Sequence, residues 1–430
     1  MPRIECDRDG DPRSIGGCTG ARMIRRRHAL VVVGCALAEL PTHAQSKPMA
    51  FQTVAAPEPM VQIAAGGPMG LLGVSVNGEL FAWPPAGGSA RRLGGDLDAT
   101  TSLAVGHGRI AARRRDGALW VLEDGRMSAS QERTLAPAAG LLVLPLAVIA
   151  IATDGKVHRV ARLEPSSSGS WTAVARSEVT VMPDARPLQA DLDGLGDAGH
   201  VVVLAGPDSE LYTHGVLGDA IEATRVVLLE RHSLRVMREL VLDAPHVFED
   251  IAPRKVVLAP RQGTEVREGL LTVQSGPQGA QLVLVDADPA ASGALRIAAR
   301  GPALGMANRW LSPITDGRHW LAVHTPHIGG LLHVYRRDGD ALLARRLEGD
   351  VSNHRIGSRL LDMSAWQGQR LLIPDQSGRR LLLLDAASDW RVVGKHQLSS
   401  RVTAMVGLGA SGRVAVLQDD GSVTVGSVAG

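Results

Sequence analysis

The chain has 430 residues, and its 46 Lys and Arg residues nearly balance 44 Asp and Glu residues, so the formal charge is only +2. This balance excludes an obvious nucleic-acid binder, because such domains carry a strong basic excess, and aromatic residues at 3% are too few for base-stacking platforms. Hydrophobic residues at 45% and charged residues at 21% are ordinary for a globular chain and exclude a disordered one.

Residues 23–44 have the features of an export signal. Three arginines at 25–27 precede a short apolar run at 29–40, and a small-x-small cleavage pattern closes the segment. The run is shorter than the roughly 20 apolar residues that span a bilayer. We therefore expect an exported protein, periplasmic or secreted, that does not span the membrane. Met23 is an alternative start, and a lipid anchor at Cys35 is the less favoured interpretation.

All three cysteines, Cys6, Cys18 and Cys35, precede the predicted cleavage point. We expect residues 1–44 to be an N-terminal extension that carries the export signal. Residues 45–430 are expected to form a single domain. That domain has no cysteine, so it has neither a disulfide nor a thiolate metal site.

From about residue 60 onward, short apolar runs alternate with turns that contain Gly and Asp. Asn77-Gly78 separates the runs at 71–76 and 79–83, and Asp116-Gly117 and Asp154-Gly155 separate similar pairs. Asn-Gly and Asp-Gly between apolar runs predict tight β-hairpins, because both turn residues must accept a positive φ. We find no long amphipathic helix, so the sequence predicts an all-β protein.

The apolar runs group into repeated modules, which start near residues 60, 98, 138, 182, 245, 306, 354 and 400. Strand groups at this period predict a β-propeller of four-stranded blades. Eight modules are counted, and a merge of two would give seven. The last module shows only three strands, so residues 49–56 are expected to supply its fourth and close the ring. A pair of β-sandwiches is the alternative fold.

Residues 189–197 read Gln-Ala-Asp-Leu-Asp-Gly-Leu-Gly-Asp and precede an expected strand at 200–204. This segment resembles the FG-GAP/VCBS repeat. That family builds integrin-α-like β-propellers, in which an Asp-rich loop between the first two strands of a blade often holds calcium. The clear match covers one module, and the later modules match only in the spacing of their strands and turns. The resemblance therefore implies a propeller whose calcium loops are mostly degenerate.

The same segment is the candidate metal site. A calcium loop supplies about six to eight oxygen ligands, with carboxylates at alternating positions and Gly at the sharp turn. Asp191 and Asp193 occupy the first two positions, Gly194 the turn, and Asp197 is a candidate for a later one. Leu195 stands where the family usually has Asp or Asn. A plain Asp/Gly turn is the alternative, so no cofactor is certain and calcium is the one suggested.

In blades of four antiparallel strands, A to D, the D–A and B–C connections share one rim of the ring. Polar residues of modules 4 to 7 gather on that rim, whereas the calcium loop lies on the other. Loops above a rigid scaffold are where ligand sites usually form. The candidate ligand-binding residues are His214, Asp219, Glu249, Asp250, Asn308, Arg309, Trp310, His327, Asn353, His354, Arg355 and Asp375.

Two of these connections share a His-(x)-Ile-Gly core, at residues 327–329 and 354–357. Internal duplication would explain this similarity without a binding site. The wider set of polar residues has its own alternative explanation, since loop polar groups also satisfy exposed turns.

The sequence favours a non-enzymatic binding or interaction scaffold, although enzymatic activity is left open. The partner would be a polar small molecule, a saccharide or a protein at this rim, since Arg, His and carboxylate side chains suit polar groups. The alternative is a propeller hydrolase or lyase with His327 or His354 as general acid or base, and with Arg309 and Arg355 clamping an anion. Nucleic acid is not an expected partner, and the oligomeric state is not predicted.

Overall fold

The computed structural model describes residues 49–192, 199–259, 267–288 and 294–427. The chain divides into two units, Met1–Gln45 and Ser46–Gly430, and every described residue belongs to the second. The predicted export signal at 23–44, the three cysteines, and Asp193 and Asp197 of the predicted calcium loop all lie outside the described residues.

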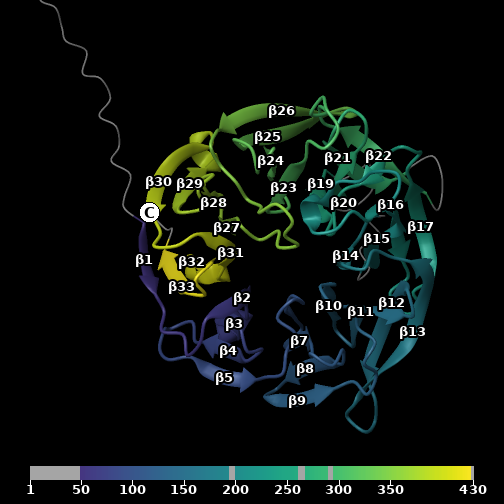
Figure 1. Ribbon diagram of the computed structural model, residues 1–430, viewed down its shortest axis with the longest axis vertical. Helices are drawn as coiled ribbons and strands as arrows, with labels where there is room; N and C mark the ends of the chain where they lie inside the picture. Colours follow the sequence, from purple (N-terminus) through teal and green to yellow (C-terminus); the bar gives the residue numbers. More distant parts are fainter. Residues whose placement is uncertain (1–48, 193–198, 260–266, 289–293, 428–430) are drawn as a thin grey trace, which may run out of the picture. The chain divides into compact units, whose positions relative to one another are not determined.

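The second unit contains eight groups of four antiparallel strands, which follow one another around a ring (Figure 1). Blade 1 holds β2 (Met60–Ala65), β3 (Leu71–Ser75), β4 (Leu80–Trp83) and β5 (Arg91–Gly94). Blade 2 holds β6 (Ala104–Gly106), β7 (Arg109–Arg113), β8 (Leu119–Glu123) and β9 (Arg126–Ala129). Blade 3 holds β10 (Leu141–Leu144), β11 (Ala147–Asp154), β12 (Val157–Pro165) and β13 (Trp171–Thr180). Blade 4 holds β14 (Leu188–Ala190), β15 (His200–Asp208), β16 (Glu222–Leu229) and β17 (Val236–Val241).

The second half of the ring repeats this pattern. Blade 5 holds β19 (Arg254–Leu258), β20 (Arg267–Ser275), β21 (Gln281–Ala287) and β22 (Leu295–Arg300). Blade 6 holds β23 (Leu311–Thr315), β24 (Trp320–His324), β25 (Leu331–Asp338) and β26 (Ala341–Glu348). Blade 7 holds β27 (Ala365–Gln367), β28 (Arg370–Pro374), β29 (Arg380–Asp385) and β30 (Arg391–Gln397). Blade 8 holds β31 (Val402–Gly407), β32 (Arg413–Gln418), β33 (Val423–Ser427) and β1 (Ala50–Thr53).

The first strand of the domain closes the last blade. Strand β1 pairs with β33 in antiparallel register, from Ala50 opposite Ser427 to Thr53 opposite Thr424. This is the closure that the sequence predicted for residues 49–56. The predicted β-propeller is confirmed, with eight blades, and the sandwich alternative is wrong.

Blades 4, 5 and 6 are also joined by backbone pairing. The short strand β18 (Val247–Phe248) pairs with β16 on one side and with β20 on the other. Arg300 of β22 forms a single parallel bridge with Ala341 of β26. The blades that carry most of the candidate site are therefore tied by hydrogen bonds as well as by side-chain packing.

Hydrophobic clusters fill every interface between neighbouring blades, including the one that closes the ring. Between blades 8 and 1, for example, Met60 and Trp83 pack with Leu417 and Val423. Successive residues of a strand point to opposite faces, so a blade with neighbours on both sides buries both sets. This explains why the central strands read as short continuous apolar runs.

The glycines of the predicted hairpin turns also hold adjacent blades together. Gly78 has a φ of +78°, and a Cβ atom there would lie 2.4 Å from the carbonyl oxygen of Leu97. Leu97, in the connection to blade 2, donates its backbone N–H to the carbonyl oxygen of Gly78 at 3.0 Å. Gly117 and Leu135 repeat this contact one blade further on. A side chain at Gly78 would therefore disturb the blade interface as well as the turn.

The helices among the described residues are short 3-10 turns at Gly67–Met69, Gly215–Leu217, Ala386–Ser388 and Gly409–Ser411. None of them is long and apolar enough to cross a bilayer.

Candidate functional site

The D–A and B–C connections of blades 4 to 7 form a continuous set of loops, which we call the site rim. It comprises residues 181–187, 209–221, 242–253, 276–280, 301–310, 325–330, 349–364 and 375–379. Residues 349–364, between β26 and β27, form a long connection that runs inward toward the centre of the ring (Figure 1). We call this segment the strap. Within it, Gly357 donates its N–H to the carbonyl oxygen of Val216 at 2.9 Å, so the strap reaches the B–C insertion of blade 4.

Arg359 fixes the strap to the first blade of the site rim. Its Nε atom lies 2.8 Å from Oδ2 of Asp184, and its Nη2 atom lies 2.6 Å from Oδ2 of Asp219. Burial raises the pKa of Asp184 and the charge of Asp219 raises it further, whereas Arg359 opposes both effects. The guanidinium therefore compensates two carboxylates whose charges repel each other. Asp219 was selected from the sequence, and Asp184 and Arg359 were not.

His327 and His354 form a hydrogen-bonded pair whose tautomers are set by one backbone carbonyl. Nε2 of His354 lies 2.8 Å from the carbonyl oxygen of Ser358, which can only accept, so Nε2 carries the proton. Nδ1 of His354 is then an acceptor, and Nε2 of His327 donates to it at 2.9 Å. The remaining nitrogen, Nδ1 of His327, carries a lone pair and has no hydrogen-bond partner among the described residues.

Both rings of this pair are neutral at neutral pH. Burial lowers the pKa of His327 to about 4, with a further contribution from His214. Burial lowers the pKa of His354 to about 3. His354 is only 2% exposed and both of its ring nitrogens are occupied by the protein. It can therefore position His327, but it cannot itself exchange a proton with a bound molecule.

Trp310 lies beneath the histidine pair. Its ring is parallel to that of His327, with an interplanar angle of 2° and centroids 6.0 Å apart. Its Nε1 atom donates to the carbonyl oxygen of Glu249 at 3.0 Å, and the residue is 2% exposed. Trp310 is thus a buried support for His327 rather than an open surface for a ligand.

His214 and Glu249 form a second pair in the same network. Nδ1 of His214 lies 2.5 Å from Oε1 of Glu249, and the hydroxyl of Ser275 donates to the other carboxylate oxygen. The Glu249 side chain is fully buried, whereas that of His214 is 20% exposed. Burial raises the pKa of Glu249, and the bonds from His214 and Ser275 lower it. Nε2 of His214 has no partner in the part of the chain that the structure describes.

This second pair has the arrangement of a general base held by a carboxylate. In such a dyad the carboxylate fixes the ring through Nδ1 and leaves Nε2 free for proton transfer. Ser275, however, donates to Glu249 and not to His214, so its hydroxyl is not activated as a nucleophile. The pair therefore supplies an oriented general base but does not activate Ser275 as a nucleophile.

Glu222 adds an uncharged carboxyl group beside this network. Its side chain is 2% exposed. Burial raises its pKa to about 10, with further contributions from the charges of Glu249 and Asp219. The group is therefore protonated at neutral pH.

The structure places Asn308 and Arg309 at the edge of the network. The backbone N–H of Asn308 donates to the hydroxyl of Tyr212 at 2.7 Å. Burial and the charge of Glu249 raise the pKa of Tyr212 to about 12, so this hydroxyl stays neutral. Arg309 is half-buried as a residue, and its guanidinium has neither an ion pair nor a hydrogen bond among the described residues.

Two other predicted residues are buried among structural partners. Asp250 is fully buried and accepts hydrogen bonds from Arg254 at 2.5 and 2.7 Å and from Thr272 at 3.0 Å. Asn353 is fully buried and donates to the hydroxyl of Ser312 at 2.8 Å. These contacts hold loops in place and leave neither side chain facing solvent.

The last two predicted residues point elsewhere. Arg355 pairs with Asp419 of blade 8 at 3.1 Å. Asp375 accepts from the hydroxyl of Ser377 at 2.7 Å and pairs with Arg380 at 3.2 Å, within its own turn. The structure therefore joins His214, Glu249, Trp310, His327 and His354 in one network and leaves Arg355 and Asp375 outside it.

Three exposed apolar side chains lie in the same connections as the residues of this network, and the sequence did not predict them. Ile328 is 65% exposed, Ile356 is 70% exposed and Met306 is 59% exposed. Ile328 and Ile356 are the isoleucines of the two His-(x)-Ile-Gly segments, so each follows a histidine of the bonded pair. Gly329 and Gly357, with φ of +63° and +75°, turn the chain directly after them. The repeated His-(x)-Ile-Gly segment was the sequence feature that could have indicated these two isoleucines.

Asp191, the described aspartate of the candidate calcium loop, directly follows β14 on the opposite rim. The backbone N–H of Asp191 donates to Oε2 of Glu268 at 2.7 Å. In the described ranges, no group of three His, Cys, Asp or Glu side chains is arranged to hold a metal ion. Asp193 and Asp197 lie outside those ranges, so calcium binding stays a prediction.

Comparison with known proteins supports the fold but identifies no family. No family model matches the chain, and no curated protein matches it. Among solved structures, the chain is similar to BamB from Moraxella catarrhalis, with 15% identity, a TM-score of 0.55, and 88% of this chain and 98% of that one covered. It is also similar to Sqt1 from Saccharomyces cerevisiae, with 10% identity, a TM-score of 0.54, and 89% and 98% covered. At these identities the likeness shows a β-propeller fold, and the FG-GAP/VCBS resemblance is supported only to that extent.

Proposed function

We propose that this chain is an exported, non-enzymatic interaction scaffold that binds an extended segment of a partner protein across the site rim. One observation carries the proposal. The two His-(x)-Ile-Gly segments bring His327 and His354 into a 2.9 Å hydrogen bond and leave Ile328 and Ile356 65% and 70% exposed beside them. The export part rests on the signal predicted at residues 23–44.

The mixture of groups favours a polypeptide over a saccharide or a small polar molecule. Exposed apolar side chains next to fixed polar groups resemble the core and rim of a protein interface. The lone pair on Nδ1 of His327 can accept from backbone or side-chain N–H groups. Sugar sites commonly use open aromatic faces, and Trp310, which could have served, is buried.

The preformed network reduces the cost of binding. His354 is held by the Ser358 carbonyl, His327 by His354, and His214 by the buried Glu249. Side chains that are already fixed lose little rotamer entropy when a partner arrives. The site rim therefore suits recognition by a rigid surface, with the exposed isoleucines as apolar anchors.

The proposal is tested by selecting binders for the full chain from a displayed library of random peptides. Hydrogen–deuterium exchange with and without the best peptide then maps the contact. We expect protection in residues 325–330 and in the strap, residues 349–364. Protection confined to the A–B and C–D connections, or the absence of any selected peptide, would contradict the proposal.

A second candidate function, a hydrolase or lyase on the same rim, is favoured by the His214–Glu249 pair alone. The carboxylate orients the ring and leaves Nε2 free, as a general base requires. On this account, His214→Gln would abolish a turnover that His354→Gln would only weaken, because His354 has no free nitrogen. Screening ester, glycoside and polyanionic uronide substrates with wild type and His214→Gln separates the two functions. Turnover that depends on His214 would replace the scaffold proposal.

A further inference from the structure

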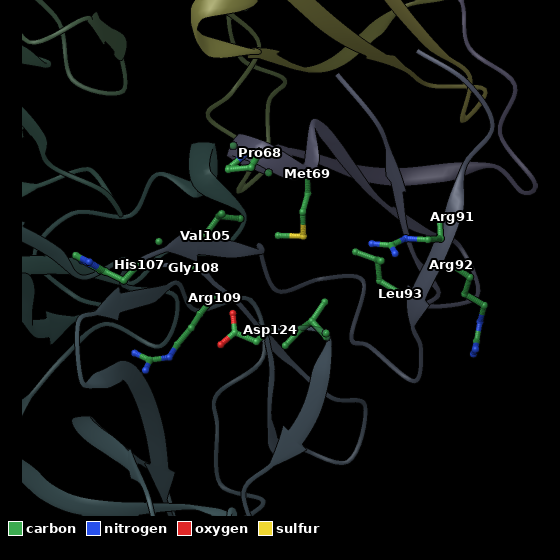
Figure 2. Close-up of a pocket in the computed structure, with 15 residues that line it drawn as sticks. Pro68, Met69, Arg91, Arg92, Leu93, Val105, His107, Gly108, Arg109 and Asp124 are labelled. Carbon is green, nitrogen blue, oxygen red and sulfur yellow. The ribbon is translucent and has the colours of Figure 1, made fainter. Parts of the chain in front are cut away.

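A cavity of about 570 Å³ lies between blades 1 and 2, on the rim opposite the site rim. It is formed by the A–B connections of both blades, by β5 and by the C–D turn of blade 2. Its volume is within the range of sites for small organic ligands. Met69, Leu93 and Val105 (Figure 2), together with Leu122, make its surface largely apolar.

Two opposite charges remain unpaired in this cavity. Arg91 and Asp124 both line it, both are exposed, and neither side chain has an ion pair or a hydrogen bond within the described ranges. Figure 2 shows the Arg91 guanidinium directed toward the cavity, and Asp124 lies apart from it on a different blade.

The other charged residues near the cavity are already neutralised or turned away. Arg109 pairs with Glu123 at 2.7 Å and donates to the carbonyl oxygen of Pro145 at 2.6 Å. Arg92 pairs with Glu79, and its side chain points away from the cavity in Figure 2. The charge that a ligand meets is therefore one cation and one anion, and not the three arginines that the lining contains.

The position of Asp124 is set by its turn. Asp124 and Gly125 have φ of +49° and +76°, which is the two-residue turn that joins β8 to β9. Asp and Asn are the non-glycine residues that tolerate this conformation best. The turn alone would be satisfied by Asn-Gly, so the carboxylate is not needed for the fold.

We propose that this cavity binds a small zwitterion with an apolar body, a short apolar peptide with free ends. Arg91 receives its carboxylate through charge-assisted hydrogen bonds, and Asp124 receives its ammonium group. The apolar body lies against Met69, Leu93, Val105 and Leu122. A simple anion or cation would match only one of the two protein charges, whereas a zwitterion matches both.

The test uses dileucine as the probe and isothermal titration calorimetry on the full chain. N-acetyl-dileucine removes the ligand's positive charge and dileucine amide removes its negative charge. Arg91→Gln and Asp124→Asn remove the matching protein charges, and Arg92→Gln is the control on the same strand. Thermal unfolding of each variant confirms that the fold is kept.

We expect dileucine to bind, and each single change of charge to weaken binding about tenfold, since a charge-assisted hydrogen bond has about this effect. The effect of each protein variant should also depend on the matching change in the ligand. Asp124→Asn should cost nothing further with N-acetyl-dileucine, and Arg91→Gln should cost nothing further with the amide. Arg92→Gln should leave the affinity unchanged.

Three results would overturn the inference. Dileucine fails to bind up to its solubility limit, or binding is insensitive to Arg91→Gln and Asp124→Asn, or only one ligand charge matters. The last result would mean a simple anion or cation site. None of them bears on the site rim, because the two proposals share no residue.

Discussion

Nε2 of His327 and Nδ1 of His354 are 2.9 Å apart, although 27 residues separate them in the chain. Each histidine comes from a different blade connection, and each is followed by an exposed isoleucine and a glycine with positive φ. The chain thus uses one short repeated segment twice, with the polar side chain turned inward and the apolar one turned outward. This inversion of the usual preference is the observation on which the proposed binding face rests.

The histidine pair predicts a loss of stability in mild acid. The pKa values in the folded chain, about 4 for His327 and about 3 for His354, lie below the ordinary value of 6.5. The unfolded chain therefore binds more protons as the pH falls below 6.5, so the stabilisation present above that pH is lost toward pH 4. Urea midpoints measured across this window should fall with pH, and the slope should be shallower in His327→Gln/His354→Gln. Equal slopes in the two proteins would contradict the neutral pair.

Arg359→Gln should destabilise the domain by about 1–3 kcal/mol, because it leaves the buried Asp184 without its partner. Arg355→Gln is the control on the same strap, since its pair with Asp419 is exposed and should contribute less than about 1 kcal/mol. Adding Asp184→Asn to Arg359→Gln should restore part of the loss. Chemical denaturation measures all three, and an Arg359→Gln variant as stable as wild type would show that the strap is held by other contacts.

Glu222→Gln should stabilise the domain, increasingly so at higher pH. A carboxyl group whose pKa is raised to about 10 in the folded state keeps its proton, whereas the unfolded chain loses it near 4.5. The contribution of Glu222 to the free energy of unfolding of the wild type is therefore fully present below pH 4.5. It declines as the pH rises toward 10. Gln has the shape of the protonated acid and no such decline, so we expect a gain of about 1 kcal/mol or more at pH 8. Parallel unfolding curves at pH 5 and pH 8 with no change in the difference would refute this.

Gly78→Ala should cost more than Gly87→Ala by at least about 1 kcal/mol. Both glycines have a positive φ, at +78° and +87°. A Cβ atom at Gly78 meets the Leu97 carbonyl oxygen at 2.4 Å, whereas one at Gly87 meets nothing within 4 Å. Thermal unfolding of the two variants separates the packing cost from the backbone cost. Equal losses would mean that the contact between blades 1 and 2 adapts to the extra atom.

Most of the fold could be predicted from local patterns. Asn77-Gly78 and Asp116-Gly117 lie in turns between the second and third strands of a blade, and Asp154 ends the second strand of blade 3 directly before the turn at Gly155. In each pair only the glycine has a positive φ, at +78°, +86° and +62°, so the prediction of positive φ at both turn residues is wrong for Asn77, Asp116 and Asp154. Glycine is the residue that indicates these turns without any knowledge of the neighbours. The three-stranded last module predicted the closing strand in the same way, since a blade edge left open would be a liability.

The site was predictable only in part. Antiparallel alternation placed His214, Glu249, His327 and His354 on one rim, and the structure joins them in one network. The same rule could not show which way each side chain points. Arg355 turns to blade 8, and Asp375 caps its own turn.

The contacts of the strap could not be predicted from the sequence. Arg359 and Asp184 are 175 residues apart, and nothing local tells where a long connection will dock. The cavity between blades 1 and 2 was missed for a similar reason. Whether Arg91 or Asp124 is unpaired depends on which other charges, such as those of Glu79 and Glu123, are already taken by Arg92 and Arg109.

The most direct test of the account is the affinity of a peptide selected on the full chain, measured with Ile328→Asp/Ile356→Asp and with Leu146→Asp. Leu146 is 70% exposed, as Ile356 is, but lies on the opposite rim. We expect the double variant to weaken binding at least about tenfold, as loss of two apolar anchors should, and Leu146→Asp to have no effect. Unchanged affinity in the double variant, or an equal loss with Leu146→Asp, would contradict the site rim as the binding face.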